Sequence, residues 1–271
     1  MEVNDNKLFT EKWGRTIKSK GGDEFSIFVP PGQKPCTQRQ FNFYYYHKLI
    51  DKLIAGRSYR NSIEFGCGRG TFSIYLNLYN NYRVNLFDLS ETGVNLARAN
   101  FALHGASGNF FVADSKNVPV VDNQYDLVVS MGLLEHQTDY PETLKEMYRV
   151  LKPGGMLITM NIPKKKSVQV LNDIYKKILR IFNKKIEIRK DYFRITDKPE
   201  NFLRNAQIVG FKNCRIIHAN PFPIFTPIPR WLEKLLTLGY RTIMVIRGLY
   251  RKEVMATGPR LAQCHFLIGL K

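Results

Sequence analysis

Short apolar runs alternate with longer amphipathic runs from Asn61 to Met160, and this alternation constrains the fold more than any other feature of the sequence. The segments between the short runs carry apolar residues at helical spacing, as Leu144, Met147 and Leu151 show. Strands that alternate with helices of this length form βαβ units, in which the strands are parallel. We therefore expect a doubly wound α/β sheet with strands at about 62–65, 82–88, 108–114, 125–131 and 155–161.

The two flanks of this core are expected to complete the sheet and to add helices to it. We divide the chain into an N-terminal extension with a cap helix at 1–60, a cofactor-binding core at 61–161 and a remainder at 162–271. The remainder contains a helix followed by a sixth strand over 196–219, and the last strand lies in "QCHFLIGLK". Two basic helical insertions, at about 162–196 and 220–261, are predicted to form a substrate lid.

A glycine-rich turn, Glu64-Phe65-Gly66-Cys67-Gly68-Arg69-Gly70, follows the first expected strand. In a doubly wound sheet the ligand lies across the carboxyl ends of the strands, and a glycine has no Cβ to hold it away from the backbone. The spacing differs from the G-x-G-x-x-G dinucleotide fingerprint, and a carboxylate at Glu64 would repel a pyrophosphate. The turn therefore favours a ligand that carries positive charge, and it argues against NAD.

With the motifs in this order, residues 61–161 resemble the class I S-adenosylmethionine-dependent methyltransferases of the small-molecule type. The glycine turn is similar to the first motif of that family, and "SMGLLEH" and "MYRVLKPGG" are similar to the motifs around its fourth and fifth strands. The resemblance implies a Rossmann-like methyltransferase fold: a seven-stranded, mostly parallel sheet with an N-terminal helical cap and lid insertions. It also implies S-adenosylmethionine as the cofactor and S-adenosylhomocysteine as the product.

The resemblance further implies which side chains contact the cofactor. Asp88, at the end of the second strand, would accept hydrogen bonds from both ribose hydroxyls, a role that suits a carboxylate. A tyrosine of the helix expected at 38–55, taken as Tyr45, would bind the cofactor carboxylate. The expected cofactor contacts are Glu64, Gly66, Cys67, Gly68, Gly70, Asp88, Leu89, Asp114, Ser115, Met131 and Tyr45.

His136 follows the fourth strand and is the candidate catalytic base. An imidazole titrates near neutrality, so it can take a proton from an acceptor hydroxyl or amine. A structural histidine that hydrogen-bonds the backbone is the alternative. Glu135, His136 and Asp139 form a local cluster of metal-ligand types, but methyl transfer from a sulfonium needs no metal and we expect none.

The net charge of +18 lies outside the centre, because residues 61–160 contain 7 Lys and Arg against 10 Asp and Glu. A basic periphery favours an anionic partner. We expect methyl transfer to O or N of a small-molecule acceptor, lipophilic or anionic: a natural product, a lipid precursor or an activated sugar. One alternative is an RNA methyltransferase, although Ser130-Met131-Gly132-Leu133 does not resemble the N-P-P-Y-like tetrapeptide of such enzymes. The other is a non-catalytic protein that keeps the cofactor fold and contacts a partner or membrane surface.

Targeting features indicate a cytoplasmic protein. The first 20 residues lack the continuous apolar segment of a signal peptide, and no apolar run approaches the ~18 residues that cross a bilayer. The four cysteines contain no C-x-x-C pair, which fits reduced thiols. Peripheral membrane contact and a homodimer stay open.

Overall fold

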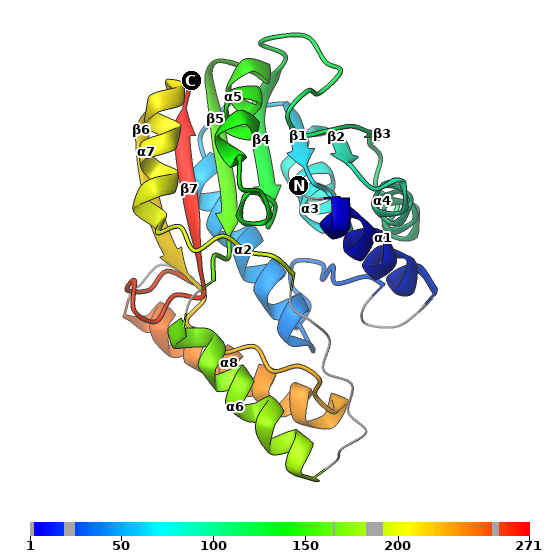
Figure 1. Ribbon diagram of the computed structural model, residues 1–271, viewed down its shortest axis with the longest axis vertical. Helices are drawn as coiled ribbons and strands as arrows, with labels where there is room; N and C mark the ends of the chain where they lie inside the picture. Colours follow the sequence, from blue (N-terminus) through cyan, green and yellow to red (C-terminus); the bar gives the residue numbers. More distant parts are fainter. Residues whose placement is uncertain (1–2, 19–24, 165, 183–191, 251–254) are drawn as a thin grey trace.

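A computed structural model describes residues 3–18, 25–164, 166–182, 192–250 and 255–271. Its centre is a seven-stranded sheet of order β3-β2-β1-β4-β5-β7-β6, in which β7 alone runs antiparallel to its neighbours (Figure 1). The expected seven-stranded, mostly parallel sheet is confirmed. The strands are β1 (Asn61–Phe65), β2 (Arg83–Asp88), β3 (Asn109–Val112), β4 (Tyr125–Met131), β5 (Leu151–Asn161), β6 (Lys212–Ala219) and β7 (Cys264–Leu270).

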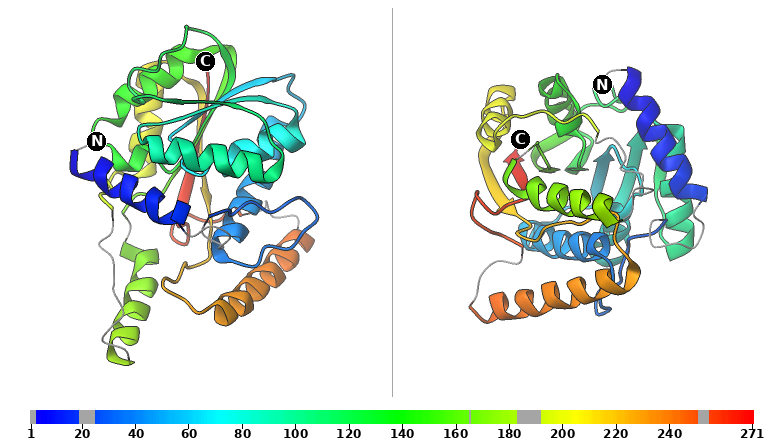
Figure 2. Two further views of the ribbon diagram at one scale, coloured as in Figure 1. Left: turned by 90° about the vertical axis from the view of Figure 1, so that its right-hand side faces the viewer. Right: turned by 60° about the horizontal axis from the view of Figure 1, so that its bottom comes forward.

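Helices cover both faces of the sheet (Figures 1 and 2). One apolar core lies under α2, α3 and α4, and a second lies under α5 and α7 on the opposite face. The helices are α1 (Val3–Lys18), α2 (Gln38–Ile54), α3 (Thr71–Asn80), α4 (Glu91–His104), α5 (Tyr140–Val150), α6 (Lys166–Phe182), α7 (Pro199–Val209) and α8 (Arg230–Leu249), with a short 3-10 helix, η1 (Leu134–His136), after β4.

Local sequence signals set most of the helix ends. Thr37 and Gln40 form the expected capping box at the start of α2, because the Thr37 hydroxyl accepts from the Gln40 N–H and the Gln40 side chain accepts from the Thr37 N–H. Gly210 ends α7 with a φ of 119°, a conformation that favours glycine. The helix predicted over 38–55 and the helix–strand unit over 196–219 are therefore confirmed.

Two elements differ from the sequence-based expectation. β5 begins at Leu151 instead of 155, because Tyr125 pairs with Leu151 and Leu127 pairs with Met156, so the intervening residues bulge out of the strand. The second difference is α1, for which no helix is predicted above. Its buried side chains Trp13 and Thr16 follow Phe9 at spacings of four and three, a helical signal that could have identified it.

The two insertions leave the sheet at the carboxyl ends of parallel strands. α6 follows β5, and α8 follows β6. Both helices lie beyond that end of the sheet (Figures 1 and 2), and Tyr175 of α6 donates to the carbonyl of Pro227 in the loop before α8. Residues 183–191 of the first insertion and 251–254 of the second lie outside the described residues. The domain boundaries and the lid role stay predictions.

Candidate functional site

The glycine turn after β1 adopts a backbone that favours glycine at three positions. Gly66, Gly68 and Gly70 have φ values of 68°, 49° and 64°. A Cβ at Gly70 would lie 3.0 to 3.1 Å from the side chains of Phe101, Ala97 and Leu86. The glycine at this position is therefore explained by its backbone angle and by core packing, without a ligand.

Asp88 at the end of β2 is held against this turn by two backbone hydrogen bonds. The Gly68 N–H donates to Oδ2 and the Ser90 N–H donates to Oδ1, each at 3.0 Å. Burial raises the pKa of Asp88, whereas these hydrogen bonds and the positive charge of Lys12 oppose that effect. The carboxylate thus has a fixed orientation beside the turn, as a ribose-binding acid requires.

Glu64 lies buried at the carboxyl end of β1 and caps the next helix. Its Oε2 accepts from the backbone N–H of Ser73 at 3.2 Å and from the Ser73 hydroxyl. Burial raises the pKa of Glu64 to about 7, with a smaller contribution from the Asp88 carboxylate and against the opposing hydrogen bonds from Ser73. This carboxylate therefore orders the first turns of α3. Its expected role toward the cofactor stays a prediction.

The side chains expected at the adenine end lie along the same edge of the sheet. Leu89 directly follows Asp88 and is 38% exposed. Asp114 is exposed after β3, where its Oδ1 accepts from the Lys116 N–H at 3.0 Å. Met131 is half-buried at the end of β4. These positions suit contacts to a ligand that crosses β2, β3 and β4.

Three other expected contacts are already engaged in packing. Cys67 is buried, and its N–H donates to the Phe87 carbonyl. Ser115 is buried, and its hydroxyl accepts from the Gln137 amide at 2.8 Å. The ring of Tyr45 packs against Phe41 and Tyr44 on its own helix. Their predicted cofactor roles, Tyr45 in particular, receive no support from these contacts.

The helix α1 covers the turn, an arrangement that the sequence patterns do not predict. A Cβ at Gly68 would lie 2.7 Å from the indole of Trp13, and the same indole reaches Gly93 at the start of α4. The hydroxyls of Thr10 and Ser90 lie 3.1 Å apart and join α1 to the loop after β2. Trp13 therefore lies directly over the glycine turn and beside Asp88.

Lys12 places a cation among aromatic rings at this site. Its Nζ lies 4.3 Å from the ring centroid of Trp13 and 5.0 Å from that of Tyr192. Burial, together with the positive charges of Arg69, Arg39 and Arg194, lowers the pKa of Lys12 to about 7. Basic side chains from α1, the glycine turn, α2 and the segment before α7 thus converge here.

His136 lies in η1 with one nitrogen engaged. Its Nδ1 lies 2.5 Å from the carbonyl of Phe193, which can only accept, so Nδ1 carries a proton and Nε2 is the basic nitrogen. Burial lowers the pKa of His136, against the opposing charge of Glu135. The ring meets Phe9 edge to face at 5.0 Å, and Phe9 stacks on Tyr192 at 4.7 Å. A neutral imidazole therefore faces an aromatic cluster.

The local cluster around His136 is not arranged for a metal. The Oε1 of Glu135 accepts from the Ile162 N–H at 3.1 Å, and Asp139 pairs with Lys116. Over the ranges that the structure covers, no group of three His, Cys, Asp or Glu side chains could hold a metal ion.

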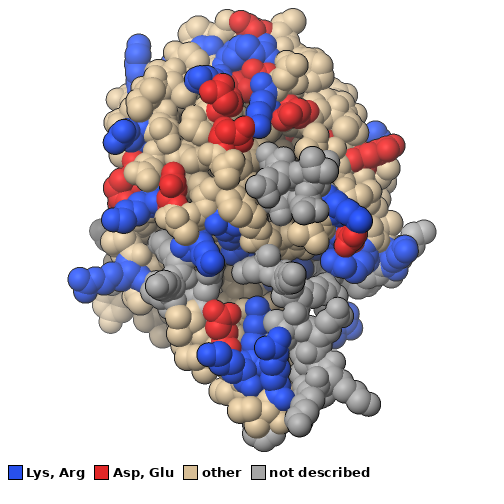
Figure 3. Space-filling model, viewed as in Figure 1, with Lys and Arg blue, Asp and Glu red and all other residues tan. Residues whose placement is uncertain are grey.

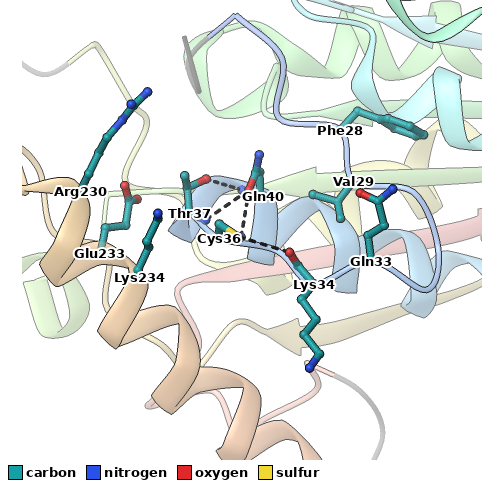
Figure 4. Close-up of a pocket in the computed structure, with 10 residues that line it drawn as sticks. All are labelled: Phe28, Val29, Gln33, Lys34, Cys36, Thr37, Gln40, Arg230, Glu233 and Lys234. Carbon is teal, nitrogen blue, oxygen red and sulfur yellow. Dashed lines mark hydrogen bonds between the residues drawn. The ribbon is translucent and has the colours of Figure 1, made fainter.

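A separate pocket of about 360 Å³ lies between α8, the start of α2 and the loop before it (Figure 4). Arg230, Glu233 and Lys234 extend from α8 along one side of it. Glu233 accepts hydrogen bonds from the backbone and side chain of Gln38, which joins α8 to α2. The lining includes none of the expected cofactor contacts, so this pocket is distinct from the glycine turn.

Comparison with known proteins agrees with this fold. Residues 63–155 match the family described as "Methyltransferase domain". The chain is 30% identical to the demethylmenaquinone methyltransferase of Listeria monocytogenes over 189 residues, which cover 64% of this chain and 78% of that protein. It is 36% identical to the ubiquinone/menaquinone biosynthesis C-methyltransferase of Haemophilus ducreyi over 84 residues, covering 30% of this chain and 32% of the relative. The match thus spans about a third of such C-methyltransferases.

Solved structures share the fold at low identity. The cyclase SpnF superposes with a TM-score of 0.63 at 17% identity, covering 98% of this chain and 96% of SpnF. Phosphoethanolamine N-methyltransferase 2 of Haemonchus contortus, solved with S-adenosyl-L-methionine, superposes with a TM-score of 0.59 at 15% identity, covering 97% of this chain and 60% of that one. At these identities the likeness concerns the fold alone, which hosts both a cyclase and a methyltransferase.

Proposed function

This chain belongs to the family of S-adenosylmethionine-dependent methyltransferases, and from that premise we propose that it methylates a small-molecule acceptor. One observation carries the proposal: Asp88, fixed by the Gly68 and Ser90 N–H groups, lies at the glycine turn beneath a cluster of aromatic and basic side chains. An acid oriented beside a glycine turn suits the cofactor, and the cluster above it suits an acceptor.

The residues at the turn fit S-adenosylmethionine, which supplies an activated methyl group. Asp88 would hold the ribose hydroxyls through its carboxylate, and Leu89 would pack on the adenine. Asp114, exposed at the end of β3, would accept from the adenine amino group. Arg39 or Arg69 would pair with the cofactor carboxylate, the role expected earlier for Tyr45, because both lie near Lys12.

The acceptor class follows from the side chains above the turn. Phe9, Tyr192 and His136 pack as mutually contacting rings, which favours a planar, lipophilic acceptor. Lys12 and Arg194 lie nearby and favour a negative charge on it. Relatives of this chain are named as C-methyltransferases and as an O-methyltransferase of the malonyl acyl-carrier protein, so the proposal extends the expected O or N to carbon.

His136 is proposed as the base that deprotonates the acceptor. The Phe193 carbonyl fixes the proton on Nδ1, so Nε2 keeps its lone pair for the acceptor proton. Burial holds the pKa of His136 below its usual value, so the ring is neutral and ready to accept at pH 7. The aromatic neighbours keep the ring in a water-poor setting.

Calorimetric titration tests the cofactor first. The purified protein should bind S-adenosylmethionine and S-adenosylhomocysteine and should not bind NAD. A panel of acidic aromatic acceptors and matched neutral analogues is then assayed for release of S-adenosylhomocysteine, and we expect turnover only with the acidic members. If the folded protein binds neither sulfur nucleotide, the non-catalytic alternative replaces this proposal.

A further inference from the structure

An exposed apolar stripe runs along the whole of α8. Trp231, Leu235, Leu238, Val245 and Leu249 repeat at spacings of four, three, seven and four, which places them on one side of the helix. Their side chains are 52% to 77% exposed. The opposite side of α8 is buried through residues such as Tyr240. A stripe of large apolar residues on a helix surface marks an interaction site.

Basic side chains border this stripe on one side. Lys234 and Arg241 each lie three or four residues from members of the stripe, and Arg230 directly precedes Trp231. Arg230 and Lys234 are exposed, and both extend from α8 in Figure 4. The sole acidic residue of α8 is Glu233, which is turned toward Gln38 of α2. The outer face of α8 is therefore apolar with a cationic edge.

We propose that α8 docks the protein on an anionic membrane surface, lying in the plane of the interface. An amphipathic helix with lysine and arginine beside an apolar face that includes tryptophan has the composition of an interfacial helix. Anionic headgroups match the cationic edge, whereas a second copy of this face would bring Arg230, Lys234 and Arg241 against like charges. Charge complementarity therefore selects lipid over self-association as the occupant.

The position of α8 supports this orientation. α6 lies at the same end of the molecule and carries its own exposed stripe of Val170, Leu171, Ile174, Ile178 and Ile181. Lys and Arg side chains gather over that end (Figure 3). Both helices extend from the carboxyl ends of the strands, where the glycine turn also lies. Docking would bring the membrane to the end of the sheet that holds the site. In the part of the chain that the structure describes, no helix is suited to span a bilayer.

Vesicle binding tests the proposal in the full chain. The protein should co-sediment with phosphatidylcholine vesicles that contain 30% phosphatidylglycerol, a composition chosen to represent an anionic surface at roughly physiological charge density. Binding should weaken in high salt, because screening shortens the range of the headgroup field. The chain has two tryptophans, so the Trp13→Phe variant leaves Trp231 as the reporter, and its emission should shift to the blue on these vesicles.

Matched variants decide the outcome. The triple variant Leu235→Ser, Leu238→Ser, Val245→Ser should lower vesicle partitioning by ~10-fold or more, since it removes three interfacial contacts. The control Leu103→Ser, Val121→Ser, Ile208→Ser alters equally exposed residues elsewhere and should bind as the wild type does. Arg230→Gln and Lys234→Gln should each lower partitioning onto anionic vesicles about fivefold.

Three results would overturn the proposal. The first is the absence of binding to anionic vesicles by the wild type, and the second is equal binding by the two triple variants. The third is a concentration-dependent dimer, seen by analytical ultracentrifugation, that the α8 triple variant abolishes and the control variant keeps. That result would assign the stripe to a second copy of the chain.

Discussion

At the scale of single residues, the chemistry of this site depends on groups whose orientation the backbone fixes. Asp88 receives two N–H groups, and His136 donates its Nδ1 proton to a carbonyl. Fixed partners of this kind leave Nε2 of His136 and the second lone pair of each Asp88 oxygen for a ligand. The two residues can therefore be tested by changes that keep their shape.

Asp88→Asn should weaken S-adenosylmethionine binding by roughly 1 to 3 kcal/mol, because one ribose acceptor becomes a donor. Titration calorimetry measures the loss. Asp173→Asn, on the exposed surface of α6, serves as the control and should bind normally. Unchanged affinity in a folded Asp88→Asn protein would remove Asp88 from the cofactor site.

His136→Gln should reduce kcat by about 10²- to 10⁴-fold, the range for loss of a general base, with cofactor affinity preserved. Burial holds the pKa of His136 below its usual value of 6.5, so the wild-type rate should be full at neutral pH and should fall only at a pH more acidic than 6.5. The residual rate of the His136→Gln variant should not show this fall at low pH. His104→Gln, whose ring contacts Ser26, is the control. A wild-type pH profile in His136→Gln would exclude the base role.

At the scale of elements, α1 and α3 meet the glycine turn from opposite sides. Trp13 of α1 lies over Gly68, whereas Gly70 at the start of α3 faces the core. Gly70 and Gly105 both have φ near 65°, but a Cβ at Gly105 would meet nothing within 4 Å. Alanine substitutions at these two glycines therefore separate the cost of backbone strain from the cost of steric crowding.

Gly105→Ala should lower the free energy of unfolding by about 1 to 2 kcal/mol, the cost of a left-handed alanine. Gly70→Ala should lose a further ~1 to 3 kcal/mol, because its Cβ would crowd three core side chains. Urea unfolding followed by circular dichroism gives both values. Equal losses of unfolding free energy would show that the side chains around Gly70 move to make room for the added methyl group.

The position of Trp13 predicts an optical signal for ligand entry. A ligand that approaches Gly68 must displace or contact the indole, so its emission should change on addition of S-adenosylmethionine. The Trp231→Phe variant isolates Trp13, because the chain has two tryptophans. NAD is the control ligand. An unchanged spectrum, in protein that binds the cofactor by calorimetry, would place Trp13 outside the path of entry.

At the scale of the whole molecule, one end of the sheet gathers the glycine turn, α6 and α8. The cofactor would join β1, β2 and β3 to the covering helix α1, so binding should stabilise the folded state as a whole. Linkage predicts about 2.7 kcal/mol at a cofactor concentration of 100 Kd.

For a chain of this size, that stabilisation corresponds to a rise in Tm of roughly 5 to 10 °C. Differential scanning fluorimetry with S-adenosylhomocysteine measures it, and NAD should leave Tm unchanged. The Asp88→Asn variant should need a higher concentration of S-adenosylhomocysteine for the same rise in Tm. No rise at saturating S-adenosylhomocysteine would contradict binding to the native state.

Local patterns in the sequence were enough to predict the sheet, most of its helices and the position of Asp88 after a strand, because periodicity and turn residues act over a few neighbours. The covering of the turn by α1 was decided by the tertiary structure. Trp13 and Gly68 are far apart in sequence, and so are Lys12 and Arg194, and no local pattern encodes such contacts.

The same distinction applies to the glycines and to the outer helices. The spacing of Gly66, Gly68 and Gly70 indicated a turn without side chains, which a ligand could approach. Only the packing shows that Gly70 faces Phe101. Periodicity indicated amphipathic helices in both insertions, whereas the structure decided which side each helix buries. A sequence determines which residues can share a face, and the tertiary contacts determine whether that face meets the core or is left for a partner.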